Sequence, residues 1–319
     1  MQADHDTRDH GGRIDRAMAT FGGTRDDWID LSTGINPVPY PLPDLPAPLW
    51  TALPDAAASQ ALIAAARQFW SVPEGASILP IPGASIAIAQ VPRLAVPATV
   101  MIRTPSYNEH AAAFQAAGWS VTDTDAAKAR VLVHPNNPDG HWFTDADANA
   151  PLTVIDESFC DVEPARSLIS CTTRPGTIVL KSFGKFWGLA GLRLGFAIGD
   201  PDLIETLANR IGPWPVSGPA LQIGTHALTN PSWADQTRRY LAAESPRLDK
   251  LVAQTGAQLI GGTTLFRLYD HPRAQDLHIH LAKHHIWTRV FPWSDTALRL
   301  GLPAPADWGR VATALESFA

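Results

Sequence analysis

Short apolar segments alternate with helix-like stretches through the middle of this 319-residue chain, and this alternation constrains the fold more than any other feature. Five apolar runs predict strands, at Thr99–Ile102, Val131–His134, Thr153–Ile155, Ile178–Leu180 and Leu194–Ile198. Because these runs are almost continuously apolar, we expect strands that are buried on both faces. Helix-like stretches such as Asn108–Gly118 lie between several of them. The pattern predicts an α/β fold, with a mostly parallel central sheet and helices on both of its faces.

Helical and strand-like patterns also flank this central region. Ala56–Trp70 has helical spacing, and Asp200-Pro201 is typical of an N-cap that opens a helix to about Ile211. A small α+β unit is expected towards the C-terminus, with helices at Trp233–Gln254, Ala274–His284 and Asp307–Phe318 and strands near Thr264–Tyr269, Trp287–Val290 and Ala297–Leu300. We predict an N-terminal arm over 1–50, a large domain over 51–212 and a small domain over 213–319.

Prolines are unusually frequent, with 28 in the chain. Many of them lie in Pro37–Pro48, where they favour extended backbone over a packed element. We interpret this run as an arm or connection. The apolar residues available to anchor it are Leu42, Leu45, Leu49 and Trp50.

Charge and cysteine content exclude several classes of protein. The net charge is -6 and charges of both signs are scattered, so neither nucleic acid nor an acidic tail is indicated. The two cysteines, Cys160 and Cys171, lack the spacing of a zinc site and fit a reducing cytosol. The polar stretch 1–12 lacks the apolar core of a signal peptide, and no apolar run reaches membrane-spanning length. We expect a soluble cytoplasmic protein that does not contact membranes.

The sharpest local signal for chemistry is Ser182-Phe-Gly-Lys185, which follows the predicted strand Ile178–Leu180. A lysine amid small residues after a buried strand is partly desolvated, which lowers the pKa of its amine and makes it a nucleophile toward an aldehyde. Ser182 and Arg193 supply a hydroxyl and a permanent cation, a natural pair for a phosphate. The alternative is a surface lysine on a glycine-rich turn, and we favour the cofactor interpretation.

Other polar residues follow predicted strands at the edge where open α/β sheets bind ligands. Asp156 is placed to pair with a protonated pyridine nitrogen, and Asn137 to donate a hydrogen bond to a phenolate oxygen. Ala84 and Ser85 begin a helix-like stretch whose free N–H groups suit an anion. The Tyr107 ring is placed to stack on a flat cofactor. Each residue alone has an ordinary alternative, namely a helix cap, a turn or a core aromatic.

Taken together and in this order, these motifs resemble the aminotransferase class I and II family, whose members have fold type I of the pyridoxal-phosphate (PLP) enzymes. Its turn, strand-end and lysine motifs here read HPNNPDG, DESF and SFGKFWGLAGLR. The resemblance implies PLP as the cofactor and a homodimer, with residues 51–212 as the PLP-binding domain. By this resemblance, Lys185 forms the Schiff base with PLP, and Asp156 pairs with its pyridine nitrogen. Asn137 donates a hydrogen bond to the phenolic oxygen, and Tyr107 stacks on the ring. The phosphate is held by Ala84, Ser85, Ser182 and Arg193, and the substrate carboxylate is bound by Arg299.

The N-terminal region resembles one branch of that family. His10-Gly-Gly-Arg13 and the later run Trp28-Ile-Asp-Leu-Ser-Thr-Gly-Ile-Asn36-Pro look like the threonine-phosphate decarboxylases of cobalamin biosynthesis. This implies decarboxylation of L-threonine O-3-phosphate to (R)-1-amino-2-propanol phosphate. His10, Arg13 and Asn36 are candidates to contact the substrate phosphate and carboxylate. The alternative for His10 and Arg13 is that they are surface residues of a mobile arm.

The chain departs from the family pattern at four positions, Ser85, Asp139, Phe159 and Gly184. The lysine motif serves decarboxylases and aminotransferases alike, so an aminotransferase acting on a phosphorylated amino acid such as histidinol phosphate is the main alternative. A binding or regulatory protein that keeps the fold without catalysis is a third interpretation.

The histidines near residue 280 are candidates for a metal site. His280 and His284 have i, i+4 helical spacing, with His278 and His285 nearby. No acid or cysteine completes a ligand set, so a solvated helix face is favoured and no metal is expected.

Overall fold

The computed structural model describes residues 8–318, which divide into two compact units. The larger unit consists of residues 39–137 and 141–238, and the smaller of 8–38, 138–140 and 239–318. The domain boundaries predicted along the chain, at residues 50 and 212, stay a prediction. Among the described residues, no helix has the length and apolar character needed to cross a membrane.

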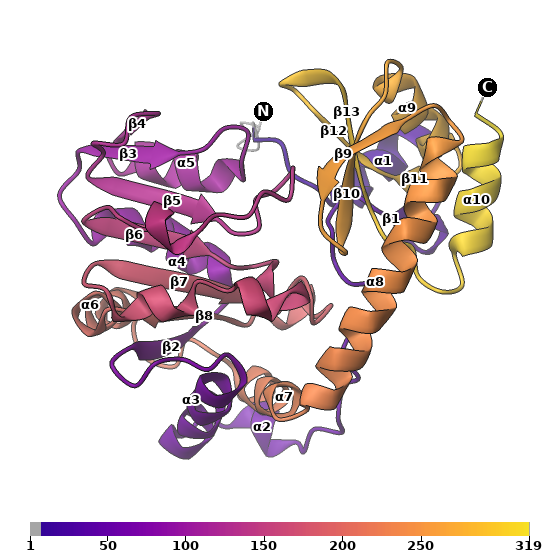
Figure 1. The fold of residues 1–319 in the computed structure, drawn as a ribbon. Coiled ribbons are helices and arrows are strands. Elements are labelled where there is room, and N and C mark those ends of the chain that lie inside the picture. The colour runs from indigo at the N-terminus through magenta and orange to yellow at the C-terminus, as the bar shows by residue number, and fades with distance from the viewer. Residues whose placement is uncertain (1–7, 319) are drawn as a thin grey trace, which may run out of the picture. The chain divides into compact units, whose positions relative to one another are not determined.

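A seven-stranded sheet forms the centre of the larger unit, in the order β2-β8-β7-β6-β5-β3-β4 (Figure 1). The strands are β2 Ser77–Ile81, β3 Thr99–Ile102, β4 Ser120–Thr122, β5 Ala129–Val133, β6 Leu152–Asp156, β7 Thr177–Ser182 and β8 Gly195–Gly199. Strands β3 to β7 pair in parallel, whereas β8 runs antiparallel to both β7 and β2. The predicted α/β fold with a mostly parallel sheet is therefore confirmed.

Two strands of this sheet, β2 and β4, were not predicted from the sequence. Both lie at edges of the sheet. Pro80 interrupts β2, and an edge strand tolerates proline because one side of its ladder needs no donor. Strand β4 is short and only partly buried, so it lacks the apolar run that marks a central strand.

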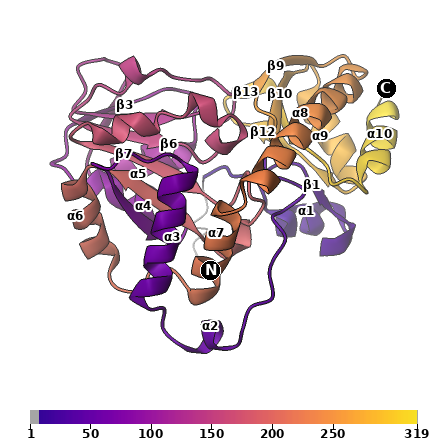
Figure 2. The same ribbon diagram turned by 60° about the horizontal axis from the view of Figure 1, so that its bottom comes forward.

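Helices cover both faces of the sheet (Figures 1 and 2). They are α2 Pro48–Thr51, α3 Ala56–Phe69, α4 Ala84–Gln90, α5 Asn108–Ala116, α6 Pro201–Ile211 and α7 Gly218–Leu228, and the long helix α8 Pro231–Ala253 begins in this unit. Helices α4, α5 and α6 pack on one face of the sheet, over Val133, Val154 and Leu180. Helices α3 and α7 lie side by side in both views and pack against each other.

The register of β6 against β7 decides which side chains share a face. Asp156 pairs with Leu180 across the two strands. Because side chains alternate along a strand, Val154 and Leu180 point to the apolar core under α4 and α5, while Lys181 points to the opposite face. Consecutive polar residues at the end of a strand therefore point to opposite faces of the sheet.

The smaller unit has a four-stranded antiparallel sheet, in the order β12-β13-β10-β9, and a parallel pair, β1 with β11. Its elements are α1 Ile14–Phe21, β1 Ile29–Asp30, β9 Gln258–Gly262, β10 Phe266–Asp270, α9 Ala274–Lys283, β11 Ile286–Trp287, β12 Arg289–Phe291, β13 Ser294–Gly301 and α10 Trp308–Glu316. The single strand expected near Trp287–Val290 is thus two strands, each in a different sheet. The N-terminal residues join this unit: α1 packs through Ile14 and Ala17 on Ala282 of α9.

The proline-rich arm is held differently from the prediction. Leu42 and Trp50, expected as anchors, are exposed. Tyr40 is the buried anchor instead: its hydroxyl donates to the His226 carbonyl at 3.1 Å, and its ring contacts Trp187 and Trp233 edge-on. Helix α2 begins at the end of this arm, with Pro48 at its first position, where the missing N–H costs nothing.

The cap of α6 yields a stability prediction. Asp200 accepts hydrogen bonds from the N–H groups of Asp202 at 2.9 Å and Gly176 at 2.7 Å, joining the helix start to the turn before β7. We expect Asp200→Ala to lower the free energy of unfolding by about 1–2 kcal/mol, since capping losses are of this size. Thermal unfolding of the variant against Asp202→Ala, an exposed first-turn change, measures the effect. Equal melting temperatures for the two variants would contradict it.

Candidate functional site

Asp156 lies at the carboxyl end of β6 and is buried. Its Oδ2 accepts a hydrogen bond from His110 Nε2 at 2.8 Å. Its Oδ1 accepts two more, from the Ser158 N–H at 3.0 Å and the Ser158 hydroxyl at 2.5 Å. A carboxylate with three donors is held in one orientation, at the sheet edge where α/β folds bind ligands.

The charge on Asp156 follows from these contacts. Burial raises the pKa of its carboxyl, but the hydrogen bonds and charge of His110 and the bonds from Ser158 outweigh burial, and the net pKa is lowered. Asp156 is therefore a fixed negative charge in a buried setting. It is suited to keep a proton on a nearby heteroaromatic nitrogen.

The sequence analysis missed His110. Its side chain is buried, and it projects from the first turn of α5. Tyr107 is the N-cap of the same helix, and its ring meets that of His110 edge-on at 6.1 Å between centroids. The spacing of three residues puts both on one face of the helix, which was the signal available in the sequence.

Asn137 follows β5, the neighbour of β6, and is buried. The turn that carries it is tied to the segment before Tyr107. Asn136 donates from Nδ2 to the Pro105 carbonyl at 3.0 Å and accepts at Oδ1 from the Ser106 hydroxyl at 2.7 Å. These bonds bring the turn of Asn137 and the start of α5 to the same end of the sheet.

Lys185 is half-buried in the turn after β7. Its Nζ lies 5.2 Å from the ring centre of Phe159, which is buried in the turn after β6. The departure at Phe159 thus places an apolar ring, in place of a hydroxyl, against the amine. At Gly184 an added Cβ would lie 3.4 Å from Ala190 Cα, so the glycine relieves a tight turn before the lysine.

The predicted phosphate-binding residues lie where the chain at Gly83 and Gly195 passes close to the start of α4 and to Arg193. Ala84 and Ser85 begin α4, and Ser182 pairs with Gly195 across β7 and β8. A Cβ on Gly195 would lie 2.7 Å from the Ala84 nitrogen, and one on Gly83 would lie 2.6 Å from Arg193 Nη2. Only glycine permits these approaches, and Gly83 also has a φ of +83°. The structure therefore brings Ala84, Ser182 and Arg193 together beside the start of α4.

These features fit PLP. A lysine amine, a buried carboxylate and a hydroxyl-and-guanidinium cradle all come from the ends of adjacent strands in the larger unit. Asp156 would hold the ring nitrogen, Lys185 the aldehyde carbon, and the Ala84, Ser182 and Arg193 group the phosphate. The roles themselves remain predictions.

The predicted substrate residues belong to the smaller unit. Arg299 on β13 is buried and donates to the Ser32 carbonyl. The Ser32 hydroxyl accepts from the Gly12 N–H at 2.7 Å, so the segment from His10 to Arg13 packs beside the same residue. Asn36 is buried and accepts from the Val38 N–H at 3.0 Å. Structure thus brings the His10–Arg13 segment and Arg299 together around Ser32.

Arg289 is a second residue that sequence reasoning missed. It lies directly opposite Arg299 in the β12–β13 ladder and donates to Asp9 Oδ2 at 3.0 Å. Burial, followed by the charge of Arg289, lowers the pKa of Arg299 to about 9, although Asp30 and Asp9 oppose this. Two guanidinium groups on facing positions form a cationic patch suited to an anionic ligand.

The histidines near residue 280 have structural partners. His280 Nε2 lies 2.9 Å from the Ala314 carbonyl, which joins α9 to α10. His278 is buried, its Nδ1 lies 2.8 Å from the Thr288 hydroxyl, and burial lowers its pKa to about 4. These contacts favour helix packing over metal binding.

The His110–Asp156 contact yields a pH prediction. Because the folded pKa of Asp156 lies below the unfolded value of about 3.9, the stability it contributes is present above that pH and is lost as the pH falls through the folded pKa. His110→Phe leaves the buried carboxylate short of a donor, and we expect it to cost about 1–3 kcal/mol at neutral pH. Thermal unfolding of the cofactor-free protein from pH 3 to 7 measures this, with His226→Phe, at a partly exposed site, as the control. A constant difference between the variant and the native protein at all pH values would contradict it.

The whole chain is similar to known proteins. Residues 27–317 match the aminotransferase class I and II family. A threonine-phosphate decarboxylase from Pseudomonas aeruginosa is 39% identical, over 97% of this chain and 98% of the relative. A threonine-phosphate decarboxylase from Sinorhizobium sp. is 40% identical, over 96% of this chain and 97% of the relative.

Solved structures show the same fold. The histidinol-phosphate aminotransferase from Sinorhizobium meliloti, in complex with pyridoxal-5'-phosphate, superposes with a TM-score of 0.82 at 18% identity, over 98% of this chain and 95% of that one. The L-threonine-O-3-phosphate decarboxylase from Porphyromonas gingivalis gives a TM-score of 0.70 at 20% identity, over 90% of this chain and 98% of that one. The chain therefore belongs to the aminotransferase class I and II family, the PLP-dependent family that its lysine, carboxylate and glycine-lined phosphate cradle resembled.

Proposed function

We propose that this protein is a PLP-dependent decarboxylase that converts L-threonine O-3-phosphate to (R)-1-amino-2-propanol phosphate, the linker of the cobalamin nucleotide loop. The observation that carries the chemistry is the buried Asp156 carboxylate, which His110 of α5 holds ionised. Asp156 ends β6, and the neighbouring strand β7 leads to Lys185. The substrate assignment is supported by two threonine-phosphate decarboxylases that align with nearly the whole chain.

When bound, PLP supplies an electron sink for the bond that breaks at the substrate α-carbon. Asp156 serves this chemistry by keeping a proton on the ring nitrogen. His110 positions Asp156 from α5, and its N–H cannot be replaced by water in so buried a place. The negative charge is thus fixed before the cofactor arrives, which is the preorganised arrangement that makes electrostatic catalysis effective.

Lys185 carries the cofactor at rest and handles the proton afterwards. In the reaction the bond between the α-carbon and the carboxylate breaks, carbon dioxide leaves, and the α-carbon gains a proton in its place. The Lys185 ammonium is the donor of that proton. The Phe159 ring, whose centre lies 5.2 Å from Nζ, packs beside the amine and limits the positions that it can take.

The remaining residues bind and orient the cofactor. Ser182 and Arg193, with the backbone at Ala84 and Ser85, hold the phosphate, and this fixes one end of PLP. Asn137 donates to the phenolic oxygen, and the Tyr107 ring covers one face of the pyridine. These residues would together fix the orientation of the cofactor.

Substrate specificity comes from the cationic patch of the smaller unit. L-Threonine O-3-phosphate has two anionic groups, a carboxylate and a phosphate. Arg299 takes the carboxylate, and Arg289 with His10, Arg13 and Asn36 provides further donors to the two groups. Holding the carboxylate perpendicular to the PLP ring selects decarboxylation over loss of the α-hydrogen.

The alternative is transamination of a phosphorylated amino acid such as histidinol phosphate. It is favoured by partial similarity: a histidinol-phosphate aminotransferase from Mycobacterium bovis is 29% identical over 64% of this chain. The Asp156 and Lys185 arrangement serves both reactions, so this alternative is decided by products alone.

The deciding experiment is to incubate the PLP-loaded protein with L-threonine O-3-phosphate and measure carbon dioxide and aminopropanol phosphate. We expect both products in equal amounts. Lys185→Ala removes both the covalent attachment of PLP and the proton donor, so product formation falls by at least about a thousandfold, as for loss of a catalytic nucleophile. Lys250→Ala, on α8, is the control and keeps full activity. Absence of both products, together with keto-acid-dependent amino transfer, would establish the alternative.

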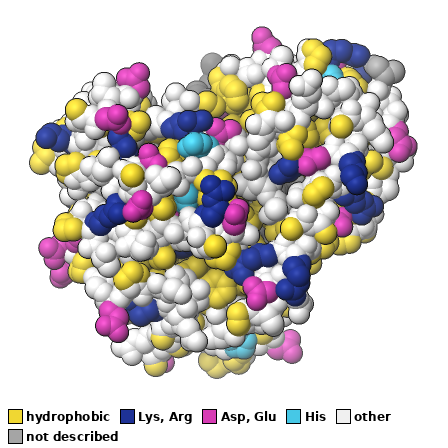
Figure 3. All heavy atoms as spheres, viewed as in Figure 1, with side chains coloured by type: hydrophobic (Ala, Val, Ile, Leu, Met, Phe, Trp, Pro, Cys, Tyr) yellow, Lys and Arg dark blue, Asp and Glu magenta, His cyan; other side chains and the backbone are white. Residues whose placement is uncertain are grey.

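We also propose that the protein is a homodimer, as the family resemblance implies. Three apolar side chains near the start of the larger unit, Leu42, Trp50 and Leu53, are 65, 67 and 68% exposed. Trp214 is also exposed, and it precedes α7, against which α2 packs. Exposed aromatic and aliphatic side chains close together are typical of a subunit interface. By contrast, on the face shown in Figure 3 charges of both signs are scattered, without a continuous basic band for nucleic acid.

Sedimentation tests the dimer. The native chain should sediment at twice its mass of 34.4 kDa. Trp50→Ser with Leu53→Ser should shift the equilibrium to the monomer, whereas Leu259→Ser with Ile260→Ser, exposed positions on β9, should leave the dimer intact. A native chain that sediments as a monomer at micromolar concentration would overturn the proposal.

A cytoplasmic location completes the assignment. Both cysteines are buried free thiols, which suits a reducing compartment. PLP enzymes with phosphorylated small substrates meet both cofactor and substrate there.

A further inference from the structure

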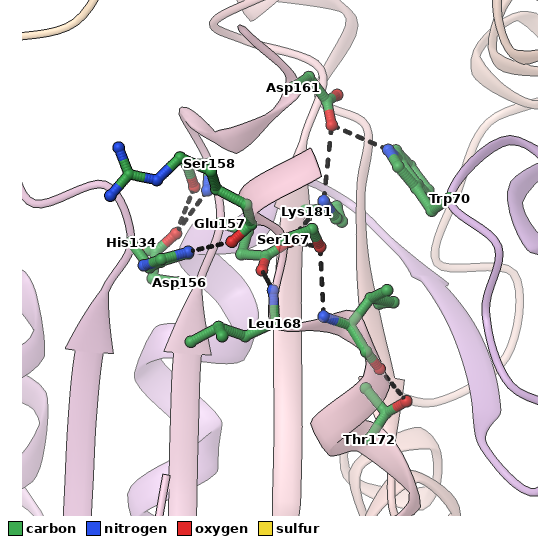
Figure 4. A network of polar contacts seen from close by, with 12 residues as sticks. Trp70, His134, Asp156, Glu157, Ser158, Asp161, Ser167, Leu168, Thr172 and Lys181 are labelled. Atoms are coloured by element: carbon green, nitrogen blue, oxygen red, sulfur yellow. Dashed lines mark hydrogen bonds and ion pairs between the residues drawn. The ribbon is translucent and has the colours of Figure 1, made fainter. Parts of the chain in front are cut away.

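A buried polar network lies at the same sheet edge as the proposed PLP site (Figure 4). Its Lys181 side chain points to the face opposite that of Val154 and Leu180. Its members come from, or directly follow, the three adjacent strands β5, β6 and β7: His134, Glu157 and Lys181. Each is next to, or three residues before, a residue that we assign to the cofactor. Glu157 follows Asp156, Lys181 precedes Ser182, and His134 precedes Asn137.

Lys181 is the centre of the network. Its side chain is 2% exposed, and its Nζ lies 2.5 Å from Glu157 Oε2, whose side chain is 0% exposed. A second carboxylate, Asp161 Oδ1, lies 3.5 Å from the same ammonium. The ammonium also lies 5.4 Å from the ring centre of Trp70, so an aromatic face covers it.

The two carboxylates are saturated with donors. Glu157 accepts from the Leu168 N–H at 2.6 Å and from the Ser167 hydroxyl at 2.7 Å. Asp161 accepts from the indole N–H groups of Trp70 at 2.9 Å and Trp187 at 3.0 Å. All these partners hold the network to the layer of loops and helices that covers this face.

His134 extends the network to β5 without making it a metal site. One oxygen of Glu157, the Cys160 sulfur and a His134 nitrogen lie within 4.8 Å of one another. However, His134 Nε2 donates to the Arg166 carbonyl at 2.7 Å, and Nδ1 accepts from the Phe143 N–H at 3.1 Å. Burial lowers the pKa of His134, so the ring is neutral. Both ring nitrogens are engaged, and the Glu157 oxygens are bonded to Lys181, Ser167 and Leu168.

The Lys181 ammonium is charged at neutral pH. Burial lowers the pKa of Lys181, but the charges of Glu157 and Asp161 raise it by more, and the net pKa is above its ordinary value. A buried ion pair of this kind is costly to assemble and adds little stability over apolar side chains of the same shape. The geometry of the pair, which fixes the direction and spacing of β6 and β7 side chains at this edge, is therefore of more interest here than its contribution to stability.

The backbone transmits the position of this network to the cofactor face. Glu157 N–H donates to the Leu180 carbonyl at 2.9 Å, and the His134 N–H donates to the Asp156 carbonyl at 2.8 Å. Because Glu157 is the residue bonded to Asp156 and its N–H is tied to β7, a displacement of the Glu157 backbone moves Asp156 with it. Binding groups must be held within about 0.5 Å of their productive geometry.

We propose that Glu157 and Lys181 are positioning residues for PLP, which act through the backbone to set the spacing between Asp156 and the Ser182–Lys185 turn. This inference rests on the proposed cofactor site, and it assigns to Glu157 and Lys181 the role of keeping the residues of that site at the correct spacing. Neither residue touches the cofactor. Their effect is on how tightly PLP binds and on how strongly Asp156 holds the proton of the ring nitrogen.

The test compares PLP binding and fold stability in the same variants. Lys181→Met leaves Glu157 uncompensated, whereas the double variant Lys181→Met with Glu157→Leu removes both charges at similar volume. The matched control is Arg267→Met, which breaks the Arg267–Asp249 pair in the smaller unit. For each protein we would measure the melting temperature without cofactor, the PLP dissociation constant, and the pH at which the visible absorbance of bound PLP changes.

We expect the double variant to melt at a higher temperature than Lys181→Met, because it also removes the uncompensated Glu157 charge, but below the native chain, because Asp161 loses its ammonium and the Leu168 N–H loses its acceptor. The PLP dissociation constant of the double variant should rise roughly 10- to 100-fold, the range seen when the supporting partners of metal ligands are removed. The absorbance transition should also move in pH, which a purely structural role would not produce. Lys181→Arg should restore part of the affinity, and Arg267→Met should change none of the cofactor readouts.

Other outcomes are decisive as well. A double variant that binds PLP with native affinity and an unshifted absorbance transition would overturn the inference. If it does not fold, Ser167→Ala, which removes one hydrogen bond to Glu157 from a partly exposed site, should still raise the dissociation constant a few-fold, and native affinity there would overturn it too. Failure of the native chain to bind PLP would instead overturn the proposed function, so the two failures are distinguishable.

Discussion

The parallel pairing of β5, β6 and β7 is the constraint on which the site depends. Parallel strands end at one edge of a sheet, so the turns after these three strands meet there whatever their separation in sequence. This places Asn137, Asp156 and Lys185 on neighbouring turns, although almost fifty residues separate the first from the last. Because side chains alternate along each strand, the residues at this edge point to two opposite faces of the sheet. One carries the cofactor residues, and the other carries the buried Glu157–Lys181 pair.

Much of the larger unit could be predicted because its strands are continuously apolar. The segments at β3, β5, β6, β7 and β8 have no polar alternative that competes with a buried strand, so pattern alone located them within about two residues, the usual uncertainty of element ends. Edge strands lack this signal. Strand β2 contains Pro80, and β9 is mostly exposed, so only pairing in the folded chain reveals them. The N-terminal helix α1 is similar, since its partners on α9 lie more than 260 residues away along the chain.

The candidate site likewise contains some residues that the sequence indicates and others that only the folded structure reveals. Lys185, Asp156 and Arg193 could be proposed from sequence because each stands beside a strand or a glycine-rich turn. The spacing of His110 from Tyr107 was a weak signal, but the significance of His110 and Arg289 comes from what faces them: a carboxylate at the end of β6 in one case, and a second arginine across a ladder in the other. A buried lysine such as Lys181 is also hard to distinguish in sequence from Lys185, the predicted Schiff-base lysine four residues later. Its two carboxylates, which keep it protonated, make the difference.

That difference bears on selectivity between the two lysines. An amine attacks an aldehyde only when it is neutral, so the carboxylates that hold Lys181 charged also remove it as a nucleophile. Lys185 is half-buried in the turn after β7, with its amine 5.2 Å from the ring centre of Phe159, and it is the lysine that we propose as the nucleophile. We therefore predict that this short stretch of chain contains one lysine for structure and one for chemistry. In the proposed function, the choice between decarboxylation and amino transfer depends on neither lysine but on the residues that orient the substrate, because orientation decides which bond at the α-carbon breaks.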